Sequence, residues 1–142
     1  MSVLVVDASV VVKWFIPEVD SDAARRLLAG SHDYIAPDLL FAETANTIWK
    51  KVRRGEVLAR DGERLVADVG RAAVETVPSR ALVADAYALA VVTGHTVYDA
   101  MYLALAVRLD TRMITADERL AGALASMPPL AAHIQKLQTF SG

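Results

Sequence analysis

Hydrophobic residues along the chain occur either in short uninterrupted runs or in longer segments with a helical period. Residues 3–6 are four consecutive aliphatic residues followed by an acid, a pattern typical of a strand buried on both faces of a sheet. Runs of this kind predict four strands and a candidate fifth, at residues 2–7, 34–36, 74–77, 112–115 and 134–137. Amphipathic or wholly apolar segments between them predict helices at residues 8–15, 21–28, 39–54, 59–72, 82–92, 99–109 and 117–126.

Proline or glycine ends most of these segments, at Pro17, Gly30, Pro37, Gly55, Pro78 and Gly94. Because strands alternate with helices, we expect an α/β fold, a parallel sheet of four or five short strands with helices on both faces. The chain has 142 residues and no repeat or linker-like stretch, so we expect one domain spanning residues 1–142.

Two predicted helices, at residues 82–92 and 99–109, are apolar on nearly every face. Such helices are normally buried, so we expect both in the core. In the helix at residues 59–72 we expect Leu65, Val66 and Val69 to face inward. The two apolar helices together exceed what a domain of this size can cover. We therefore expect one of them to pack against a second copy of the chain in a two-fold dimer.

The composition limits the class of protein and its compartment. Hydrophobic residues make up 54% of the chain and charged residues 23%, as in a globular protein. Without cysteine, the chain can form neither a disulfide nor a thiolate metal site, which fits the reducing cytoplasm. We also expect neither secretion nor membrane insertion. The N-terminus lacks a signal-peptide pattern, and no apolar run approaches about 20 residues.

A parallel sheet binds ligands outside the carboxyl ends of its strands, and two of four candidate acidic residues are expected there. Asp7 ends the first strand, and Asp117 follows the fourth. Asp99 opens an apolar helix, and Glu43 lies at the edge of an apolar stripe, with Asn46 one turn later. Each acid also has a structural explanation: a turn, a helix dipole, a helix cap or a solvated helix face. Taken singly, none of them identifies a site.

The net charge of −2 comes from 17 acids and 15 bases. If four acids bind cations, the other 13 leave an excess of two bases. Net charge therefore neither favours nor excludes a nucleic-acid partner.

Four segments carry these acids in order: Val-Leu-Val-Val-Asp-Ala-Ser (3–9), Ala-Pro-Asp-Leu-Leu-Phe-Ala-Glu-Thr-Ala-Asn (36–46), Tyr-Asp-Ala-Met-Tyr-Leu-Ala-Leu-Ala (98–106) and Ile-Thr-Ala-Asp-Glu-Arg-Leu (114–120). They resemble the four motifs of PIN-domain nucleases, in particular the VapC-type toxins of prokaryotic toxin–antitoxin pairs. The resemblance extends from residue 3 to about residue 120, and no acidic position departs from the family pattern.

The resemblance implies a Mg²⁺-dependent endoribonuclease, with Mn²⁺ as a substitute, whose catalytic and metal-binding acids are Asp7, Glu43, Asp99 and Asp117. Asp7 and Asp99 would hold the principal ion. Glu43 and Asp117 would either complete a second site or act through metal-bound water. Hydrogen bonds that orient these acids are expected from Ser9, Thr115 and Asn46. Carboxylates suit this chemistry, because hard cations prefer oxygen ligands and activate water for attack on a phosphodiester.

A basic cluster follows Glu43 on the same helix, formed by Lys50, Lys51, Arg53 and Arg54. One interpretation is a solvated helix end that complements the helix dipole. The other is a phosphate-binding track that leads the RNA substrate to the acids. The sequence leaves both interpretations open.

Other functions are tested on the same residues. A haloacid-dehalogenase-like phosphatase needs a second acid two residues after Asp7, where this chain has Ser9. A response-regulator receiver needs an aspartate after the third strand, where Val77 is followed by Pro78 and Ser79. Two alternatives stay open: a housekeeping PIN-domain nuclease that processes RNA, and a non-catalytic binding module on the same fold. An antitoxin gene directly upstream would favour the toxin.

A VapC-type toxin would bind a cognate antitoxin protein, and we expect an apolar segment of that partner to lie in a hydrophobic groove. The first predicted helix supplies more large apolar side chains than a short surface turn needs, namely Val11, Trp14, Phe15 and Ile16. These residues are either a wall of that groove or part of the core.

Overall fold

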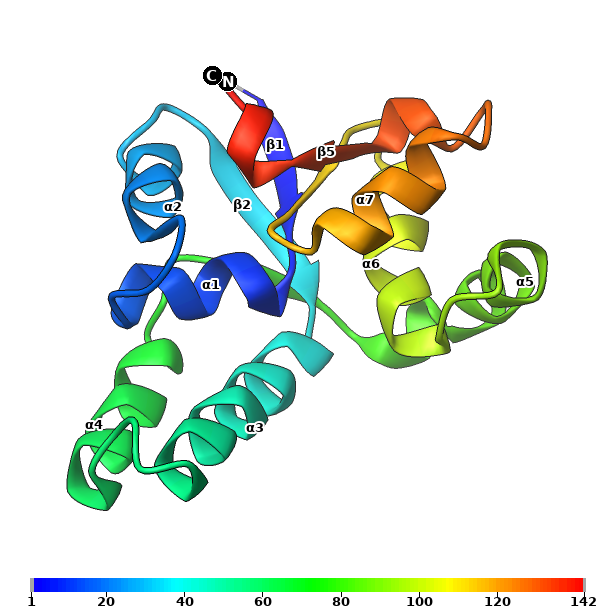
Figure 1. Cartoon of the computed structure of the whole chain (residues 1–142). Coiled ribbons are helices and arrows are strands. Elements are labelled where there is room, and N and C mark those ends of the chain that lie inside the picture. Colours follow the sequence, from blue (N-terminus) through cyan, green and yellow to red (C-terminus); the bar gives the residue numbers. More distant parts are fainter. Residues whose placement is uncertain (1, 142) are drawn as a thin grey trace.

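A computed structural model describes residues 2–141 and has a five-stranded parallel sheet at its centre (Figure 1). The strand order is β3-β2-β1-β4-β5, with β1 (Val3–Val6), β2 (Asp33–Pro37), β3 (Glu75–Val77), β4 (Met113–Thr115) and β5 (Ile134–Lys136). In the middle of the sheet, Val5 pairs with Ile35 of β2 and with Met113 of β4. The predicted parallel sheet is confirmed, including its candidate fifth strand.

The α-helices of the described residues are α1 (Ala8–Phe15), α2 (Ser21–Leu28), α3 (Leu39–Arg53), α4 (Ala59–Val69), α5 (Val83–Thr93), α6 (Val97–Arg108) and α7 (Glu118–Ala125). Parallel connections cross a sheet in the right-handed sense, so connections that run in opposite directions lie on opposite faces. By this rule α1 to α4 cover one face and α5 to α7 cover the other. Figure 1 shows α1 and α2 on one side of β1 and β2, with α6 and α7 on the other.

The strand order reverses between β1 and β4. The chain moves outward from β1 to β2 and β3, then returns to the far side of β1 to form β4. Val6 pairs with Ile114, so Asp7 and Thr115, which come next, lie at neighbouring strand ends. Connections leave the two strands toward opposite faces at such a point, and this is where open α/β sheets bind their ligands.

A tightly buried core supports these strand ends. Val5, Val6 and Ile114 have no exposed surface. α6 packs across β1 and β2 and is buried at every position from Ala100 to Ala106. Burying each large aliphatic side chain stabilises the fold by about 1.5–3 kcal/mol. The residues that follow β1 and β4 are therefore held on a rigid scaffold.

The helix predicted at residues 82–92 forms as α5, but the prediction that it is buried is wrong. Ala86 is its buried residue, whereas Tyr87, Val91 and Val92 are 64%, 68% and 73% exposed. α5 packs chiefly on α6, so only one of its faces is covered, and an apolar pattern on all faces gives no sign of which one. Within residues 2–141 no single helix is long and apolar enough to cross a membrane. α5 and α6 together have the length and composition, but they bend by 111° at their junction.

The large side chains of α1 belong to the core, which decides between the two interpretations of residues 11–16. Val11, Trp14 and Ile16 are at most 8% exposed, because α1 packs against α2, α3 and β4. The indole Nε1 of Trp14 also donates a hydrogen bond of 2.9 Å to the carbonyl of Ala24. The predicted groove wall in this segment is therefore wrong.

An apolar groove of about 410 Å³ lies instead between α3 and α4. Its lining residues are Ala45, Ile48, Trp49, Val52, Ala59, Gly62, Glu63 and Val66. Val66 was expected to face inward but is 41% exposed, because α4 buries Gly62 and Val69 and leaves Val66 at the groove. A Cβ at Gly62 would come within 2.9 Å of a methyl group of Val52, so glycine allows the two helices to approach closely here.

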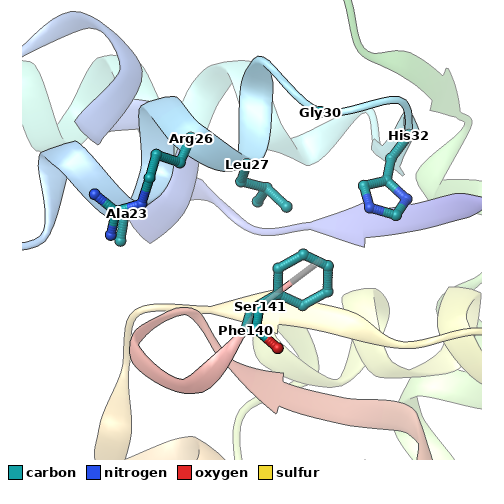
Figure 2. A pocket seen from close by; sticks show the side chains of 7 residues that line it. All are labelled: Ala23, Arg26, Leu27, Gly30, His32, Phe140 and Ser141. Atoms are coloured by element: carbon teal, nitrogen blue, oxygen red, sulfur yellow. The ribbon is translucent and has the colours of Figure 1, made fainter.

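Another hollow, of about 200 Å³, lies at the amino ends of β1 and β2, at the opposite end of the sheet from Asp7 (Figure 2). It separates α2 from the C-terminal segment and is lined by Ala23, Arg26, Leu27, Gly30, His32, Phe140 and Ser141. The rings of His32 and Phe140 meet edge to face with their centroids 5.6 Å apart. This contact joins the C-terminal segment to the start of β2, away from the acids.

Candidate active site

Asp7 is the first residue after β1 and caps the N-terminus of α1. Its Oδ1 accepts hydrogen bonds from the Ser9 amide (3.0 Å), the Val10 amide (3.3 Å) and the Ser9 hydroxyl (2.5 Å). Burial raises the pKa of Asp7 to about 6, although the hydroxyls of Ser9 and Thr115 and the Val10 amide favour its charged form. A strand-end carboxyl group with so large a shift is a candidate functional group and not only a helix cap.

Hydrogen bonds between the loops after β1 and β4 bring Asp117 to the same edge of the sheet. The Ser9 hydroxyl lies 3.4 Å from the Thr115 hydroxyl and accepts a hydrogen bond of 3.0 Å from the Ala116 amide. The Thr115 hydroxyl accepts the amide of Asp117 at 3.1 Å, and the Asp117 side chain caps α7. Ser9 and Thr115 therefore join the two loops that carry Asp7 and Asp117.

Glu43 and Asp99 come from α3 and α6, which cover opposite faces of the sheet. The Thr96 hydroxyl accepts the Asp99 amide at 3.2 Å, and this cap starts α6 at Val97, two residues earlier than predicted. One turn after Asp99, the hydroxyl of Tyr102 donates a hydrogen bond of 2.6 Å to Oε1 of Glu43. This bond connects the two helices across the carboxyl edge of the sheet.

The four acids are close enough for their charges to interact, and Asp99 is at the centre of the group. Burial raises the pKa of Glu43, and the charge of Asp99 raises it further. Burial also raises the pKa of Asp99, with a further contribution from the charge of Asp117. Asp99 in turn adds to the raised pKa of Asp7. The structure therefore brings all four acids to one edge of the sheet.

These acids have the chemistry of a divalent-cation site. The hydrogen bonds to the side chains of Asp7 and Asp117 go to Oδ1, and the Tyr102 bond to Glu43 goes to Oε1. In the described part of the chain, no hydrogen bond reaches the second oxygen of Asp117 or of Glu43, and the second oxygen of Asp7 has the Thr115 hydroxyl as its neighbour, so these oxygens could bind an ion. A cation among desolvated carboxylates that repel one another would relieve that repulsion. Within residues 2–141 no three acidic or histidine side chains form a ready-made metal cluster, so the acids would have to draw together around the ion.

Of the other polar and basic residues that were expected beside the acids, some lie near them in the structure and some do not. Asn46 is exposed on α3 and, among the described residues, is not a hydrogen-bond partner of the acids. Lys50, Lys51 and Arg54 line a cleft of about 310 Å³ that also touches Ser9 and Asp117. Arg53 points elsewhere, with its guanidinium 5.3 Å from the ring centre of Trp49.

Two residues near the acids were not found from the sequence. Tyr102 lies in the third motif and in an apolar helix but had no expected role at the site, although its position three residues after Asp99 places both on one helix face. Lys13 lines the same cleft as Lys51. The signal that could have found it is its charge, since it is the only charged residue in the apolar segment 8–15.

Comparisons with known proteins agree with this arrangement. The family model described as PIN domain matches residues 4–123. Ribonuclease VapC3 of Pyrobaculum aerophilum is 34% identical over 120 residues, which cover 83% of this chain and 92% of the relative. The crystal structure of PAE2754 from Pyrobaculum aerophilum superimposes with a TM-score of 0.68 at 22% identity, covering 97% of this chain and 85% of that one.

A toxin–antitoxin complex from Klebsiella pneumoniae contains a chain with the same fold. It superimposes with a TM-score of 0.62 at 12% identity, covering 94% of this chain and 97% of that one. At such low identity the two solved structures support the fold, while the family model and the VapC3 relative support the family. The chain therefore belongs to the PIN-domain family and, within it, to the VapC group.

Proposed function

We propose that this protein is a metal-dependent endoribonuclease that acts as the toxin of a toxin–antitoxin pair. The observation that carries the proposal is the group of four acids around Asp99 at the strand-order reversal. Three of them, Asp7, Glu43 and Asp99, have raised pKa values. Buried carboxylates that repel one another destabilise the fold, and a catalytic cation would account for their presence together. The VapC3 relative is named a ribonuclease, which supports RNA as the substrate.

The four acids and Ser9 would have different roles in the hydrolysis of a phosphodiester. A divalent cation, Mg²⁺ or Mn²⁺, would neutralise the acids and supply the Lewis acidity needed for attack of water on phosphorus. Asp7 and Asp99 are the proposed ligands of the principal ion. Glu43 and Asp117 would either hold a second ion or orient the attacking water. Ser9 fixes one oxygen of Asp7, which leaves the other to face the ion.

The test of catalysis uses purified protein and single-stranded RNA. We expect cleavage with Mg²⁺ or Mn²⁺. We expect it to stop when EDTA is added and to return when the metal is restored. A second readout is independent of activity: Mg²⁺ alone should raise the melting temperature of the wild type but not of Asp7→Asn. Cleavage that continues in EDTA would overturn the role of the metal. Binding of RNA without cleavage would favour the non-catalytic module.

Expression of the chain alone in bacteria separates the toxin from a housekeeping nuclease. A toxin that cuts RNA in the cytoplasm should slow growth, and Asp7→Asn should not. Co-expression of a small upstream gene should restore growth. Harmless expression of a protein that cuts RNA when purified would favour the housekeeping nuclease.

The groove between α3 and α4 is the proposed docking site of the antitoxin. Its lining is almost wholly apolar, and Trp49 and Val66 are 53% and 41% exposed there. An amphipathic helix can cover such a surface with side chains spaced one turn apart. The similarity in fold to the chain of the Klebsiella pneumoniae toxin–antitoxin complex supports a protein partner of this kind.

The homodimer is proposed to form through α5 and the start of α6. Exposed apolar side chains gather there: Val83, Tyr87, Val91, Val92 and Tyr98. A second copy would remove this surface from water, and a two-fold axis would bring the same residues together from both chains.

A further inference from the structure

The cleft beside the acids has a floor formed by two lysines and one glutamate. The Nζ atoms of Lys13 and Lys51 lie 3.0 Å and 2.6 Å from the two carboxylate oxygens of Glu18. The side chains of the two lysines are only 12% and 13% exposed. Glu18 is itself fixed, because its amide donates a hydrogen bond of 2.9 Å to Oγ of Ser21. Two ammonium groups are therefore held in defined places on the floor of the cleft.

The two lysines keep donors that the protein does not use. An ammonium group has three N–H donors. In the described part of the chain, Lys13 donates to Glu18 and to the carbonyl of Val19, at 2.7 Å, so it keeps one donor. Lys51 pairs closely with Glu18 alone, since Glu56 approaches it only to 3.7 Å. These donors are available to an acceptor in the cleft.

Positive charge also exceeds negative charge around the cleft. Its lining contains four cations, Lys13, Lys50, Lys51 and Arg54, against the carboxylates of Glu18 and Asp117. The carboxylate of Glu56 lies beside the cleft, 3.7 Å from Lys51 and 3.4 Å from Arg54. Burial by itself raises the pKa of Glu18, but hydrogen bonds from Lys51 and Lys13 outweigh it and hold the pKa below its usual value. Glu18 is therefore ionised and bonded to both lysines. With Glu56 included, four cations face three carboxylates, so one positive charge remains to attract an anion.

We infer that Lys13 and Lys51, held in place by Glu18, form a subsite for a backbone phosphate of RNA, next to the phosphate that is cleaved. The inference rests on the proposed ribonuclease function. The cleft touches Ser9 and Asp117, so a strand whose scissile phosphate lies at the acids can place a neighbouring phosphate over the lysines. Phosphate oxygens accept hydrogen bonds from ammonium groups, and partly desolvated cations bind them more strongly than solvated ones. Because the subsite would contact only the phosphate, it would not distinguish one base from another. It would fix the direction in which the RNA strand lies.

The test measures binding of a labelled single-stranded RNA by fluorescence anisotropy in EDTA, over a range of salt concentrations. Lys13→Gln and Lys51→Gln should each weaken binding roughly tenfold and reduce the salt dependence of the logarithm of affinity by about 0.7. The matched control is Arg64→Gln. Arg64 is also ion-paired, at 2.5 Å from Asp61, and its loss changes the net charge by the same amount away from the cleft. Binding by the lysine variants that equals binding by the Arg64 variant would overturn the subsite.

Glu18→Gln is a variant that we expect to change the RNA affinity in the opposite direction from the lysine variants. It keeps the shape of the side chain and one acceptor for the lysines but removes a negative charge that competes with phosphate. We expect the lost competition to outweigh the looser hold on the second lysine, so RNA binding should tighten about threefold. This test holds even if a lysine variant fails to fold, and unchanged or weaker binding by Glu18→Gln would refute the inference. If inorganic phosphate inhibits cleavage but the lysine variants bind RNA like the wild type, the cleft binds free phosphate and not RNA. If the wild type binds RNA as expected but never cleaves it, the nuclease proposal fails and the subsite stands.

Discussion

Tyr102 and Glu43, 59 residues apart in the sequence, are joined by a hydrogen bond of 2.6 Å from the phenol hydroxyl to Oε1. Tyr102 is 2% exposed, and burial raises the pKa of its phenol well above the ordinary value, with further contributions from the charges of Glu43, Asp7 and Asp99. The phenol therefore stays neutral and can only donate to the carboxylates. It is a positioning residue that holds Glu43 toward the other acids.

Replacement of Tyr102 by phenylalanine should leave the helix packed but release Oε1 of Glu43. A hydrogen bond to a charged group contributes about 1.5–3 kcal/mol, so we expect kcat to fall at least tenfold with little change in KM. The Mg²⁺ concentration that half-saturates the thermal shift should rise as well. Tyr98→Phe is the control, because Tyr98 lies on the same helix but is 59% exposed. Equal kcat values for the two variants would show that Tyr102 only packs.

Asp7→Asn should abolish cleavage and also stabilise the metal-free protein at neutral pH. Asparagine caps a helix as well as aspartate does, so α1 should keep its cap. The folded-state pKa of Asp7 is about 6, against 3.8 for an unperturbed group, so the native state holds this proton more tightly than the unfolded state. The stability of the wild type should therefore fall as the pH rises from about 4 to 6.

The increase in the free energy of unfolding caused by Asp7→Asn should follow that pH dependence. It should be absent below about pH 4 and reach about 3 kcal/mol at pH 7, which is the free energy equivalent of the shift. Urea unfolding at several pH values in EDTA measures it. Asp99→Asn should also increase the stability of the metal-free protein at neutral pH, because burial and a neighbouring charge raise the pKa of Asp99 as well. A variant less stable than the wild type at pH 7 would show that its carboxylate is not under electrostatic strain.

The sequence was sufficient to predict the sheet and the place of the acids, because both depend on strong local signals. The aliphatic run that ends at Asp7 and the short strand before Asp117 specify buried parallel strands. Two such strand ends must meet where the strand order reverses. Most helix boundaries were also close, although the Thr96 cap starts α6 two residues before the predicted position.

What the sequence could not specify depends on which surfaces meet. An all-apolar segment such as α5 is compatible with any covered face, so the exposure of Val91 and Val92 required the packing of α5 on α6. In the same way, Trp14 could have been surface or core until α1 was placed against α2 and β2. The hydrogen bond between Tyr102 and Glu43 joins helices from opposite faces of the sheet, and no local sequence pattern predicts it.

Val66→Asp should prevent binding of the antitoxin without reducing RNA cleavage. Val66 lines the groove between α3 and α4 and is 41% exposed, so the unbound protein should tolerate the charge. Covering an unpaired carboxylate with an apolar helix costs several kcal/mol, which corresponds to at least a hundredfold weaker binding. Calorimetry with the purified antitoxin measures the affinity. If Val66→Asp binds the antitoxin as tightly as the wild type does, the partner docks elsewhere.

Val92→Asp should separate the homodimer into monomers. Val92 is 73% exposed on α5, and the valine-to-aspartate change matches the one made at Val66, so each variant serves as the control for the other. A two-fold interface contains every substitution twice and places two like charges near each other in a desolvated contact, which should weaken association more than a hundredfold. Analytical ultracentrifugation at micromolar concentration should find a dimer for the wild type and for Val66→Asp, and a monomer for Val92→Asp. A wild-type monomer would refute the dimer itself. A Val92→Asp variant that stays dimeric would place the interface on another surface, and α5 would then need a different partner.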